Sequence, residues 1–415
     1  MAGEAEGSGV VVEQAAAALP DDVIVDIFLR LPPKSLLRCC FVCKRWRRLG
    51  SGRDFLDKHH LRQPAQPLLR IYRTAGEDLE SRLLAFLHYC LEAVDLSRPC
   101  AEPLQTVVRF KDKEYIDLAD EGICDALEVN GSCNGLLLLN YVGAFFVCNP
   151  ATRRWAPLAL PSLRPCDVLG FYAHTPSGEY RVLYRRLLRA RQRHFDERRY
   201  YVLTVGSQHP RRIKLRVSSD PDSVGVAQAL SKAGLVRAGA MPPVLLHGRL
   251  HWPPHPLQEG NILVFDTEAE EFRWMRPPMA RNNNILFETE GMLALSCWAC
   301  EQNVPTVYLW IRQQYETNLW FCKCRIRLPV IEVNGVHKGM PMNVVIVSQE
   351  GDMLVEFRDM VLHCDNEGTR LHTFSPGGPV ISFTRHMLKA SLVQHQFLQN
   401  RQDGGADEPP FFKGV

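Results

Sequence analysis

The hydrophobic pattern of this 415-residue chain changes character near residue 65. Before that point, the stretch LPDDVIVDIFLRL carries five apolar residues at helical spacing, Val23, Ile24, Ile27, Phe28 and Leu31. A proline and two aspartates precede this stripe, and both residue types suit the first turn of a helix, where N–H groups are unpaired and the dipole is positive. The pattern therefore predicts a helix that ends at the following Pro-Pro pair.

A second helical stretch is predicted directly after these prolines. Its apolar positions also fall on one side, while the arginines and Lys44 take the other faces. The apolar side consists of Leu36, Cys39, Val42, Cys43, Trp46 and Leu49. The two stretches predict a small helical module over residues 19–61, which is too short to bury much apolar surface by itself.

From about residue 65 onward, short apolar runs separated by Gly, Asn and Asp turns predict β-strands. Three passages, which begin at residues 133, 246 and 349, repeat one arrangement, and a looser copy begins at 289. Each has a polar-glycine turn, two strands, an Asn or Asp turn and a further strand with an aromatic residue. Repeats of this kind predict propeller blades, and about 330 residues at roughly 50 per blade give six or seven.

The predicted fold class is therefore α+β, with a small N-terminal three-helix module before a mainly β domain. That domain, residues 65–395, is predicted to form a six- or seven-bladed propeller. Residues 1–18 and 399–415 are expected to be disordered tails, the second because it is polar and rich in Gly and Pro. Residues 76–96 have a helix-like composition inside the β region, so helix and strand both stay open there.

Composition and charge change this picture little. A hydrophobic fraction of 46% and a charged fraction of 23% are typical of a globular protein, and a net charge of +3 predicts no strong general attraction to DNA or anionic lipid. No run approaches the length of a membrane helix, and the first residues lack the basic start of a secretory signal. Many of the 14 cysteines lie in apolar runs, which favours reduced thiols and a cytoplasmic or nuclear location.

Two cysteine clusters contain enough potential ligands for a metal site, but neither has a fitting pattern. In the helical module, Cys39 and Cys43 are one turn apart, but the nearest histidines are adjacent in sequence, whereas a zinc finger separates its two histidines. The second cluster contains Cys297, Cys300, Cys322 and Cys324. In a strand, the first two would point to opposite faces, so we expect buried thiols in adjacent strands and no metal.

A histidine cluster, His247, His251 and His255, has four-residue spacing, but the glycine and prolines between its members exclude a regular helix. No carboxylate partner is evident near it in the sequence, which argues against catalysis or metal binding. The chain also lacks the common catalytic and nucleotide-binding motifs, such as G-x-S-x-G, H-E-x-x-H and the P-loop. The sequence therefore predicts no catalytic residue, no metal and no cofactor.

The most basic part of the chain is residues 185–216, with eleven Lys or Arg against two acidic residues. The pattern predicts a hairpin whose loop is residues 190–199. One interpretation is a solvated strand edge, on which charge discourages aggregation. The other is a cationic patch for an acidic partner or a phosphate backbone, although sparse aromatic residues argue against single-stranded nucleic acid. The candidate target-binding residues in this loop are Arg191, Arg193, Arg198 and Arg199.

The stretch LPDDVIVDIFLRLPPKSLLRCCFVCKRWRRL closely resembles an F-box, the module that docks onto the Skp-family adaptor of SCF-type (cullin-RING) ubiquitin ligases. The residues that match the F-box pattern, and that the resemblance assigns to adaptor binding, are Leu19, Pro20, Ile24, Ile27, Leu31, Pro32, Leu36, Val42, Cys43 and Trp46. The passages NGLLLL, NPATRRW, HGRLHW and VFDTEAEEFRW resemble the F-box-associated region of plant F-box proteins, which is often a kelch-like propeller.

This resemblance implies a non-catalytic substrate receptor. The helical module would bind the adaptor and, through it, a cullin, while the β domain would hold a target protein for ubiquitination and degradation. Neither a membrane nor a nucleic acid is expected as a partner. Two alternatives stay open: a protein that binds nucleic acid or an acidic partner through residues 185–216, and a metal-dependent propeller enzyme that uses the cysteine or histidine clusters.

Overall fold

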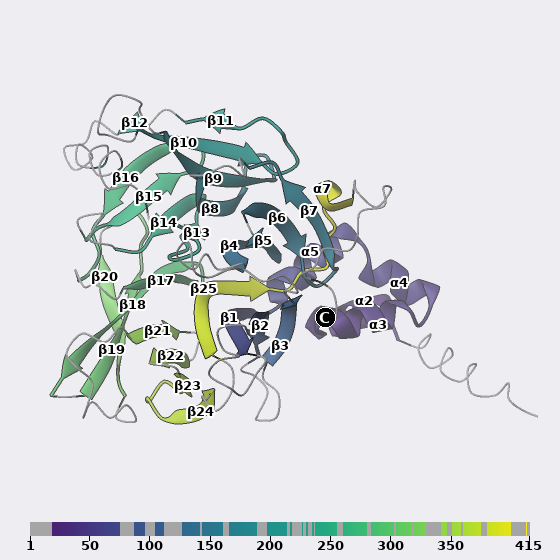
Figure 1. Cartoon of the computed structure of the whole chain (residues 1–415). Helices are drawn as coiled ribbons and strands as arrows, with labels where there is room; N and C mark the ends of the chain where they lie inside the picture. Colours follow the sequence, from purple (N-terminus) through teal and green to yellow (C-terminus); the bar gives the residue numbers. More distant parts are fainter. Residues whose placement is uncertain are drawn as a thin grey trace, which may run out of the picture.

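The computed structural model of the chain contains a helical module followed by a ring of β-sheets (Figure 1). It describes residues 19–74, 87–95, 104–111, 127–160, 166–188, 197–399 and Phe412, with short gaps inside these ranges and longer ones within 214–236 and at 329–341. No described helix is long and apolar enough to cross a membrane.

Four helices form the described part of the N-terminal module, one more than the sequence predicts. They are α2 (Asp21–Arg30), α3 (Pro33–Cys40), α4 (Lys44–Gly50) and α5 (Arg53–Arg62). The predicted second helical stretch is interrupted because the backbone becomes extended at Cys43, where φ is -154°. Cys43 Sγ accepts a hydrogen bond from the backbone N–H of Trp46 at 3.4 Å, so this cysteine caps α4 and does not lie inside a helix.

The strands form six antiparallel blades, which confirms the predicted propeller and sets the number of blades at six. Blade 1 contains β25 (Val380–Lys389), β1 (Ala65–Thr74), β2 (Leu87–Val94) and β3 (Leu104–Lys111). Blade 2 contains β4 (Leu127–Cys133), β5 (Leu136–Tyr141), β6 (Ala144–Asn149) and β7 (Arg154–Leu158). Blade 3 contains β8 (Cys166–His174), β9 (Glu179–Leu188), β10 (Glu197–Thr204) and β11 (Arg211–Arg212).

The other three blades repeat this order. Blade 4 contains β13 (Val244–Leu246), β14 (Arg249–Trp252), β15 (Ile262–Asp266) and β16 (Glu271–Met275), with β12 (Arg216–Val217) added in parallel to β16. Blade 5 contains β17 (Ile285–Thr289), β18 (Met292–Glu301), β19 (Val304–Arg312) and β20 (Trp320–Arg327). Blade 6 contains β21 (Met342–Ile346), β22 (Met353–Phe357), β23 (Met360–Cys364) and β24 (Arg370–Phe374).

The passages that repeat in sequence coincide with two kinds of tight turn. Between the first two strands of a blade, the two turn residues have positive φ, as at Asn134 (49°) with Gly135 (81°) and at His247 (48°) with Gly248 (70°). Paired positive φ values match the right-handed twist of the flanking strands, which explains the recurring glycine. For residues 76–96 the sequence leaves helix and strand open. The described part of this segment forms a strand, β2.

The second kind of turn joins the last two strands and is held by an Asn or Asp side chain. Oδ1 of Asn149 accepts hydrogen bonds from the backbone N–H groups of Ala151 and Thr152 at 3.0 and 3.3 Å. Asp266 and Asp365 accept two backbone N–H groups in the same way in blades 4 and 6. These side chains replace backbone partners inside the turn, which is why Asn or Asp recurs there.

The last strand of the chain closes the ring. β25 pairs with β1 in an antiparallel register that places Ala65 opposite Lys389. Thr384 Oγ1 also donates to the carbonyl of Leu68 at 2.9 Å, in a buried position. Blade 1 is therefore built from both ends of the β domain, so the ring closes only when the C-terminal strand is present.

The alternating strand directions divide the turns of the propeller between two faces. Turns between the first and second strands, and between the third and fourth, lie on one face, which also carries the helices and is called the helix-bearing face below. The opposite face, called the far face, is where the second strands of the blades end and the third strands begin. Residues 390–399, including α7 (Gln396–Gln399), follow β25 across the helix-bearing face.

The helical module is packed against the propeller and shares its core with it. Only two residues separate α5 from β1. Leu392 and Val393, which follow the closing strand, belong to one buried cluster with Ile24, Phe28, Leu29, Leu36, Phe55 and Leu56 of the helices. The His60 ring donates from Nδ1 to the carbonyl of Ala390 at 3.0 Å, and Lys389 Nζ donates to the carbonyl of Leu61 at 2.7 Å. The module is thus completed by residues from the other end of the chain.

Phe412 lies within the C-terminal segment that the sequence predicts to be disordered. Its ring is 1% exposed and belongs to the core cluster shared by blades 1 and 2. This position therefore contributes to the packed core, and the residues around it lie outside the described part of the chain.

Candidate partner-binding surfaces

The helical module carries large apolar side chains that nothing in the described chain covers. Six of the ten large hydrophobic residues that are exposed in the described part of the chain lie between residues 19 and 42, namely Leu19, Val23, Ile27, Leu37, Phe41 and Val42. Val23 and Ile27 are four residues apart in α2, so they share one face of the helix, and Leu19 lies just before the helix begins. Phe41 is 77% exposed and Val42 is 55% exposed at the turn between α3 and α4. These six residues are called the exposed apolar face below.

The residues assigned to adaptor binding by resemblance divide between the surface and the core. Leu19, Pro20, Ile27, Pro32 and Val42 are exposed, whereas Leu31, Cys43 and Trp46 are half-buried. Ile24 and Leu36 are 2% and 0% exposed, so assigning them to the surface is wrong: they fill the core of the module. The Trp46 ring also packs inward, edge-on to the Phe28 ring at 5.3 Å.

Three exposed apolar residues, Val23, Leu37 and Phe41, were missed by the sequence comparison with the F-box pattern. The sequence pattern places Val23 in one apolar stripe with Ile24 and Phe28, whereas the first helix is apolar on two sides. The sequence signal for these exposed positions is the four-residue spacing of Leu19, Val23 and Ile27. Val23 and Ile27 each directly precede a buried residue of the same helix, Ile24 and Phe28.

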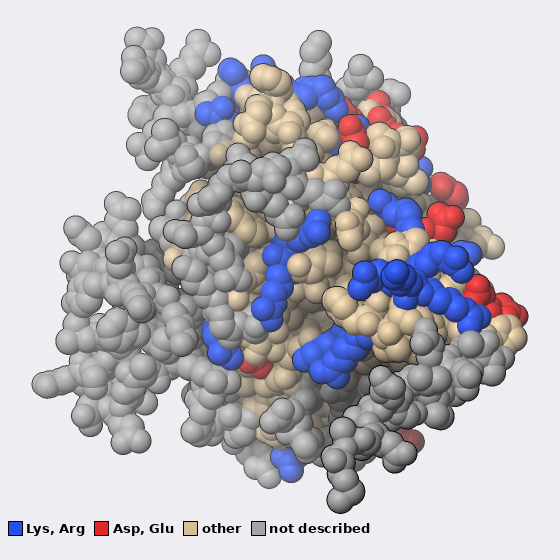
Figure 2. Space-filling view, turned by 90° about the vertical axis from the view of Figure 1, so that its right-hand side faces the viewer, with Lys and Arg blue, Asp and Glu red and all other residues tan. Residues whose placement is uncertain are grey.

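Basic side chains accompany the exposed apolar face. Figure 2 shows the side of the molecule that carries the helices, on which Lys and Arg predominate over Asp and Glu. Arg45 of α4 donates from Nε to Asp21 at 2.7 Å and from its terminal nitrogen to the carbonyl of Leu19 at 2.8 Å. Arg45 therefore holds α4 against the start of α2 and fixes the position of Leu19.

The basic hairpin is confirmed only in part. β9 ends at Leu188 and β10 begins at Glu197, so Arg198 and Arg199 lie in a strand, and their placement in the loop is corrected. Arg191 and Arg193 lie outside the described residues. The described ends of this hairpin, Leu188 and Glu197, are the end of the second strand and the start of the third strand of blade 3, on the far face.

Part of the positive charge of this segment is neutralised within the fold. Arg185 is 9% exposed at its side chain and forms an ion pair with Asp167 at 2.5 Å. Arg211 donates to both carboxylate oxygens of Glu270 in blade 4. These two arginines connect strands and blades, which favours a structural role for them over binding to a phosphate backbone.

The cysteine cluster of blade 5 does not form the expected pair of buried strands. Cys297 is buried, but Cys300 and Cys322 are exposed. β19 lies between β18 and β20, so the two cysteine-bearing strands are not adjacent, and the expectation is wrong on both points. Among the described residues, no three His, Cys, Asp or Glu side chains are grouped so that they could hold a metal ion.

Two histidines of the other cluster meet at a tyrosine. His251 is fully buried, and its ring nitrogens lie 3.1 Å from the carbonyl of Val244 and 2.6 Å from the hydroxyl of Tyr315. Burial lowers the pKa of His251 to about 4, and three nearby arginines act in the same direction. The His247 ring lies edge-on to Tyr315 at 5.1 Å, while His255 lies outside the described residues.

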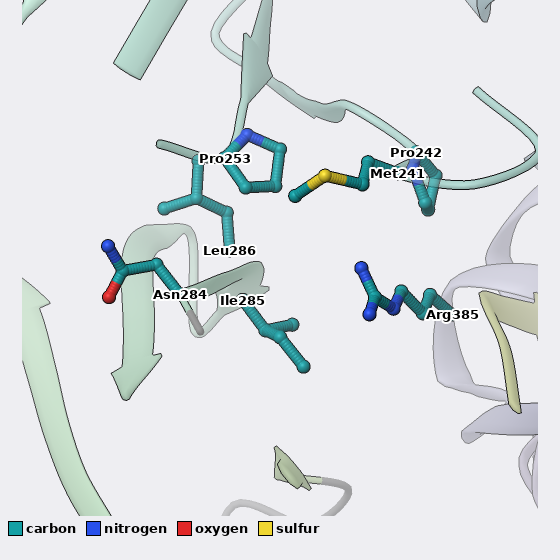
Figure 3. Close-up of a pocket in the computed structure, with 7 residues that line it drawn as sticks. All are labelled: Met241, Pro242, Pro253, Asn284, Ile285, Leu286 and Arg385. Carbon is teal, nitrogen blue, oxygen red and sulfur yellow. The ribbon is translucent and has the colours of Figure 1, made fainter. Parts of the chain in front are cut away.

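A small cavity lies where β25, β17 and the segment before β13 approach one another (Figure 3). Its volume of about 20 Å³ gives room for one or two water molecules. Met241, Pro242, Pro253, Asn284, Ile285, Leu286 and Arg385 line it. This cavity is too small for a substrate or cofactor.

These features define a protein with two parts, a helical module with an uncovered apolar side and a six-bladed propeller that presents turns on two faces. Comparison with known families assigns both parts. Residues 16–62 match the F-box-like family, and residues 120–375 match the F-box associated beta propeller domain. The chain therefore belongs to the F-box proteins with an F-box associated β-propeller domain.

Similar proteins from Arabidopsis thaliana support this assignment. F-box protein At3g07870 is 26% identical over 392 residues, covering 85% of this chain and 86% of its own. F-box protein At5g49610 is 25% identical over 405 residues, covering 92% and 98%. F-box protein CPR1 is 30% identical over 324 residues, covering 72% and 70%. Among solved structures, the designed protein Ika8 aligns over 75% of this chain and 88% of its own, with a TM-score of 0.30 and 10% identity.

Proposed function

We propose that this protein is the substrate-recognition subunit of an SCF-type ubiquitin ligase. In this proposal the exposed apolar face of the helical module binds a Skp-family adaptor, and the propeller binds a target protein. The observation that carries the proposal is the exposed apolar face itself, because large hydrophobic side chains gathered on one small module are typical of a protein interface.

The adaptor-binding residues proposed here are those at the surface. Leu19, Ile27 and Val42 come from the F-box pattern, and Val23, Leu37 and Phe41 are added because they are exposed beside them. Ile24, Leu36 and Trp46 act indirectly, since they pack the helices that position this surface. Pro20 begins the first helix by accepting the Ile24 N–H at 3.1 Å, which fixes the start of α2.

The proposed receptor performs no chemistry itself. It would bring a target close to a separate ubiquitin-transferring enzyme and so raise the effective concentration of target lysines there. The firm packing of the helical module on the propeller supports this role, because the distance between adaptor and target is then fixed by the receptor.

The test is recovery of a co-expressed Skp-family adaptor with the purified protein. Ile27→Asp and Phe41→Asp each place a charge on the exposed apolar face and should weaken adaptor binding by roughly ten- to a thousandfold. Leu371→Asp is the matched control, because Leu371 is an exposed hydrophobic residue of β24 whose exposed fraction of 51% lies between those of Ile27 and Phe41. Thermal unfolding of each variant shows whether the fold is kept.

The proposal fails if the wild-type protein recovers no adaptor. It also fails if Ile27→Asp and Phe41→Asp recover as much adaptor as wild type. A loss shared with Leu371→Asp would mean that any charge on a hydrophobic surface residue disturbs recovery, and would contradict a localised interface.

A further inference from the structure

Three arginines converge on the ring of Tyr315, at the boundary between blades 4 and 5. The guanidinium carbons of Arg249, Arg312 and Arg273 lie 5.2, 5.7 and 6.0 Å from the ring centroid. Tyr315 belongs to the turn between β19 and β20, while Arg249 and Arg273 belong to β14 and β16 of the neighbouring blade. This group of four residues is called the Tyr315 cluster below.

The positive charges of the Tyr315 cluster are only partly balanced by acidic residues. Arg249 pairs with Asp266 at 3.0 Å and, at 3.5 Å, with Glu316, whose side chain is 78% exposed. Arg312 is 6% exposed and donates to the carbonyl of Tyr315 at 3.1 and 2.8 Å, so it holds the turn. Within the described chain, Arg273 contacts the Tyr315 ring and forms no ion pair.

The same three arginines also act on the neighbouring His251. Burial is the main cause of its lowered pKa, and the charges that act on it are those of Arg273, Arg312 and Arg249, all in the lowering direction. Burial also lowers the pKa of Arg312; the charge of Arg273 acts in the same direction, and Tyr315 and Glu316 act against it. Repulsion between like charges in a partly desolvated place raises the free energy of the protein. An anion bound among the arginines would reduce this repulsion.

The Tyr315 cluster is reachable from solvent on the helix-bearing face. His247, which packs against Tyr315, is exposed, and Arg249, Arg273 and Tyr315 are half-buried. The turn that contains His247 joins the first two strands of blade 4, and the turn that contains Tyr315 joins the last two of blade 5. Blades 4 and 5 lie on the side of the ring away from the helices, so a partner there would not compete with the helical module for space (Figure 1).

We propose that the Tyr315 cluster binds a carboxylate side chain of an acidic segment in the target protein. Arg273 offers its planar fork to the carboxylate, and the exposed edge of the cluster admits an extended peptide. The inference rests on the proposed function in one respect, that the acidic segment belongs to a protein brought for ubiquitination. Preference for a carboxylate is a property of the site alone and is tested without a target.

The probe is a fluorescein-labelled oligoglutamate peptide, and binding to the full chain is measured by fluorescence anisotropy at low salt. Arg273→Gln should weaken binding about tenfold, since a hydrogen bond to a charged group contributes on the order of 1.4 kcal/mol or more. Arg273→Lys should restore part of the loss, because charge returns without the fork. Arg370→Gln is the matched control: Arg370 is an exposed arginine of β24, on a different blade, and its loss should leave binding unchanged.

The proposal is overturned if Arg273→Gln binds the peptide as wild type does, or if Arg370→Gln loses as much. Tighter binding of a single-stranded oligonucleotide, with the same dependence on Arg273, would overturn the assignment to an acidic protein segment. Adaptor recovery from the same preparation separates this inference from the proposed function. If the protein binds oligoglutamate through Arg273 but recovers no adaptor, the carboxylate site is supported and the proposed ligase function is contradicted.

Discussion

Asn149 Nδ2, in blade 2, donates a hydrogen bond to the carbonyl of Ser391 at 3.0 Å, and both residues are fully buried. The same side chain uses Oδ1 to hold the turn that contains Ala151, and Ala151 packs against the core of the helical module. One amide therefore links a blade turn, the segment after the closing strand and the helices.

Replacing Asn149 with Ala should lower the free energy of unfolding by about 1–3 kcal/mol, because a buried carbonyl loses its donor. Chemical denaturation followed by fluorescence measures this. Asn140→Ala is the control, since Asn140 Oδ1 holds a similar turn at 3.0 Å nearer the surface and makes no long-range bond in the described chain. Equal losses in the two variants would contradict a special role for the Asn149–Ser391 bond.

The helical module should depend on the end of the chain. Leu392 is 5% exposed within the helical core, so Leu392→Ala should cost about 2–5 kcal/mol and speed hydrogen exchange in α2 more than in blade 4. Hydrogen–deuterium exchange with mass spectrometry provides the comparison. Leu371→Ala, at an exposed leucine, should change neither region, and uniform faster exchange in Leu392→Ala would show that the module has no separate dependence.

Stability should fall with acid because of buried neutral histidines. His386 is 4% exposed and donates from Nε2 to the carbonyl of Val129 at 3.0 Å. Burial lowers its pKa from 6.5 to about 4, so between these values the unfolded chain binds a proton that the folded chain does not. The unfolding free energy should therefore drop by about 3 kcal/mol from this residue as pH falls from 6.5 to 4.

His386→Gln keeps a donor for the Val129 carbonyl but cannot titrate, so its unfolding free energy should depend less on pH in that window. His209→Gln, at an exposed histidine, should leave the pH dependence of wild type unchanged. Denaturant midpoints at a series of pH values give the slopes. A slope in His386→Gln as steep as in wild type would assign the acid sensitivity to other groups.

The start of the first helix should matter for adaptor binding. Leu19 is 42% exposed and Pro20 precedes the helix, so Leu19→Ala combined with Pro20→Ala should weaken adaptor binding by roughly ten- to a thousandfold. Target binding by the propeller should persist, and such a protein would protect its target from turnover. Co-purification with the adaptor is the measurement, and undiminished recovery by the double variant would contradict this role.

The basic connection of blade 3 remains a candidate for target binding. Reversing Arg191, Arg193, Arg198 and Arg199 to Glu should weaken target capture and leave adaptor binding intact. Quantitative affinity purification with ligase activity blocked compares the variant with wild type. The strand ends that flank this connection, Leu188 and Glu197, lie on the far face, whereas the Tyr315 cluster lies on the helix-bearing face. A loss of target capture in only one of the two sets of variants would therefore identify the face that targets use. Unchanged target capture after all four reversals would mean that these arginines form a solvated strand edge and do not bind the target.

Local patterns predicted the helices and blades well because their causes are local. The apolar spacing of α2 and the positive-φ turns at Gly135 and Gly248 depend on neighbours in sequence. The break between α3 and α4 was missed because it depends on one backbone angle at Cys43, in a run that reads as continuously helical. The sequence predicts six or seven blades, and not one number, because the repeats are unevenly spaced.

Features that join distant parts of the chain could not be predicted from sequence. Nothing near Leu392 indicates that it completes a core begun at Ile24, more than 360 residues earlier. The Tyr315 cluster likewise draws on Arg249, Arg273 and Arg312, which lie in three separate strands of two blades. Ile24 and Val23 illustrate the limit at short range: a helix apolar on two sides does not reveal which side its own fold will cover.

The closing strand also sets the order in which the protein becomes complete during synthesis. Domains generally fold from the N-terminus as the ribosome releases them. Here blade 1 lacks a strand until β25 emerges, and the helical module lacks Leu392 and Val393 until a few residues later. A nascent chain therefore exposes its first-made helices with an unfinished core for almost the whole of translation. Both ends mature together, so a prematurely terminated chain would lack a closed ring and a finished helical module at once.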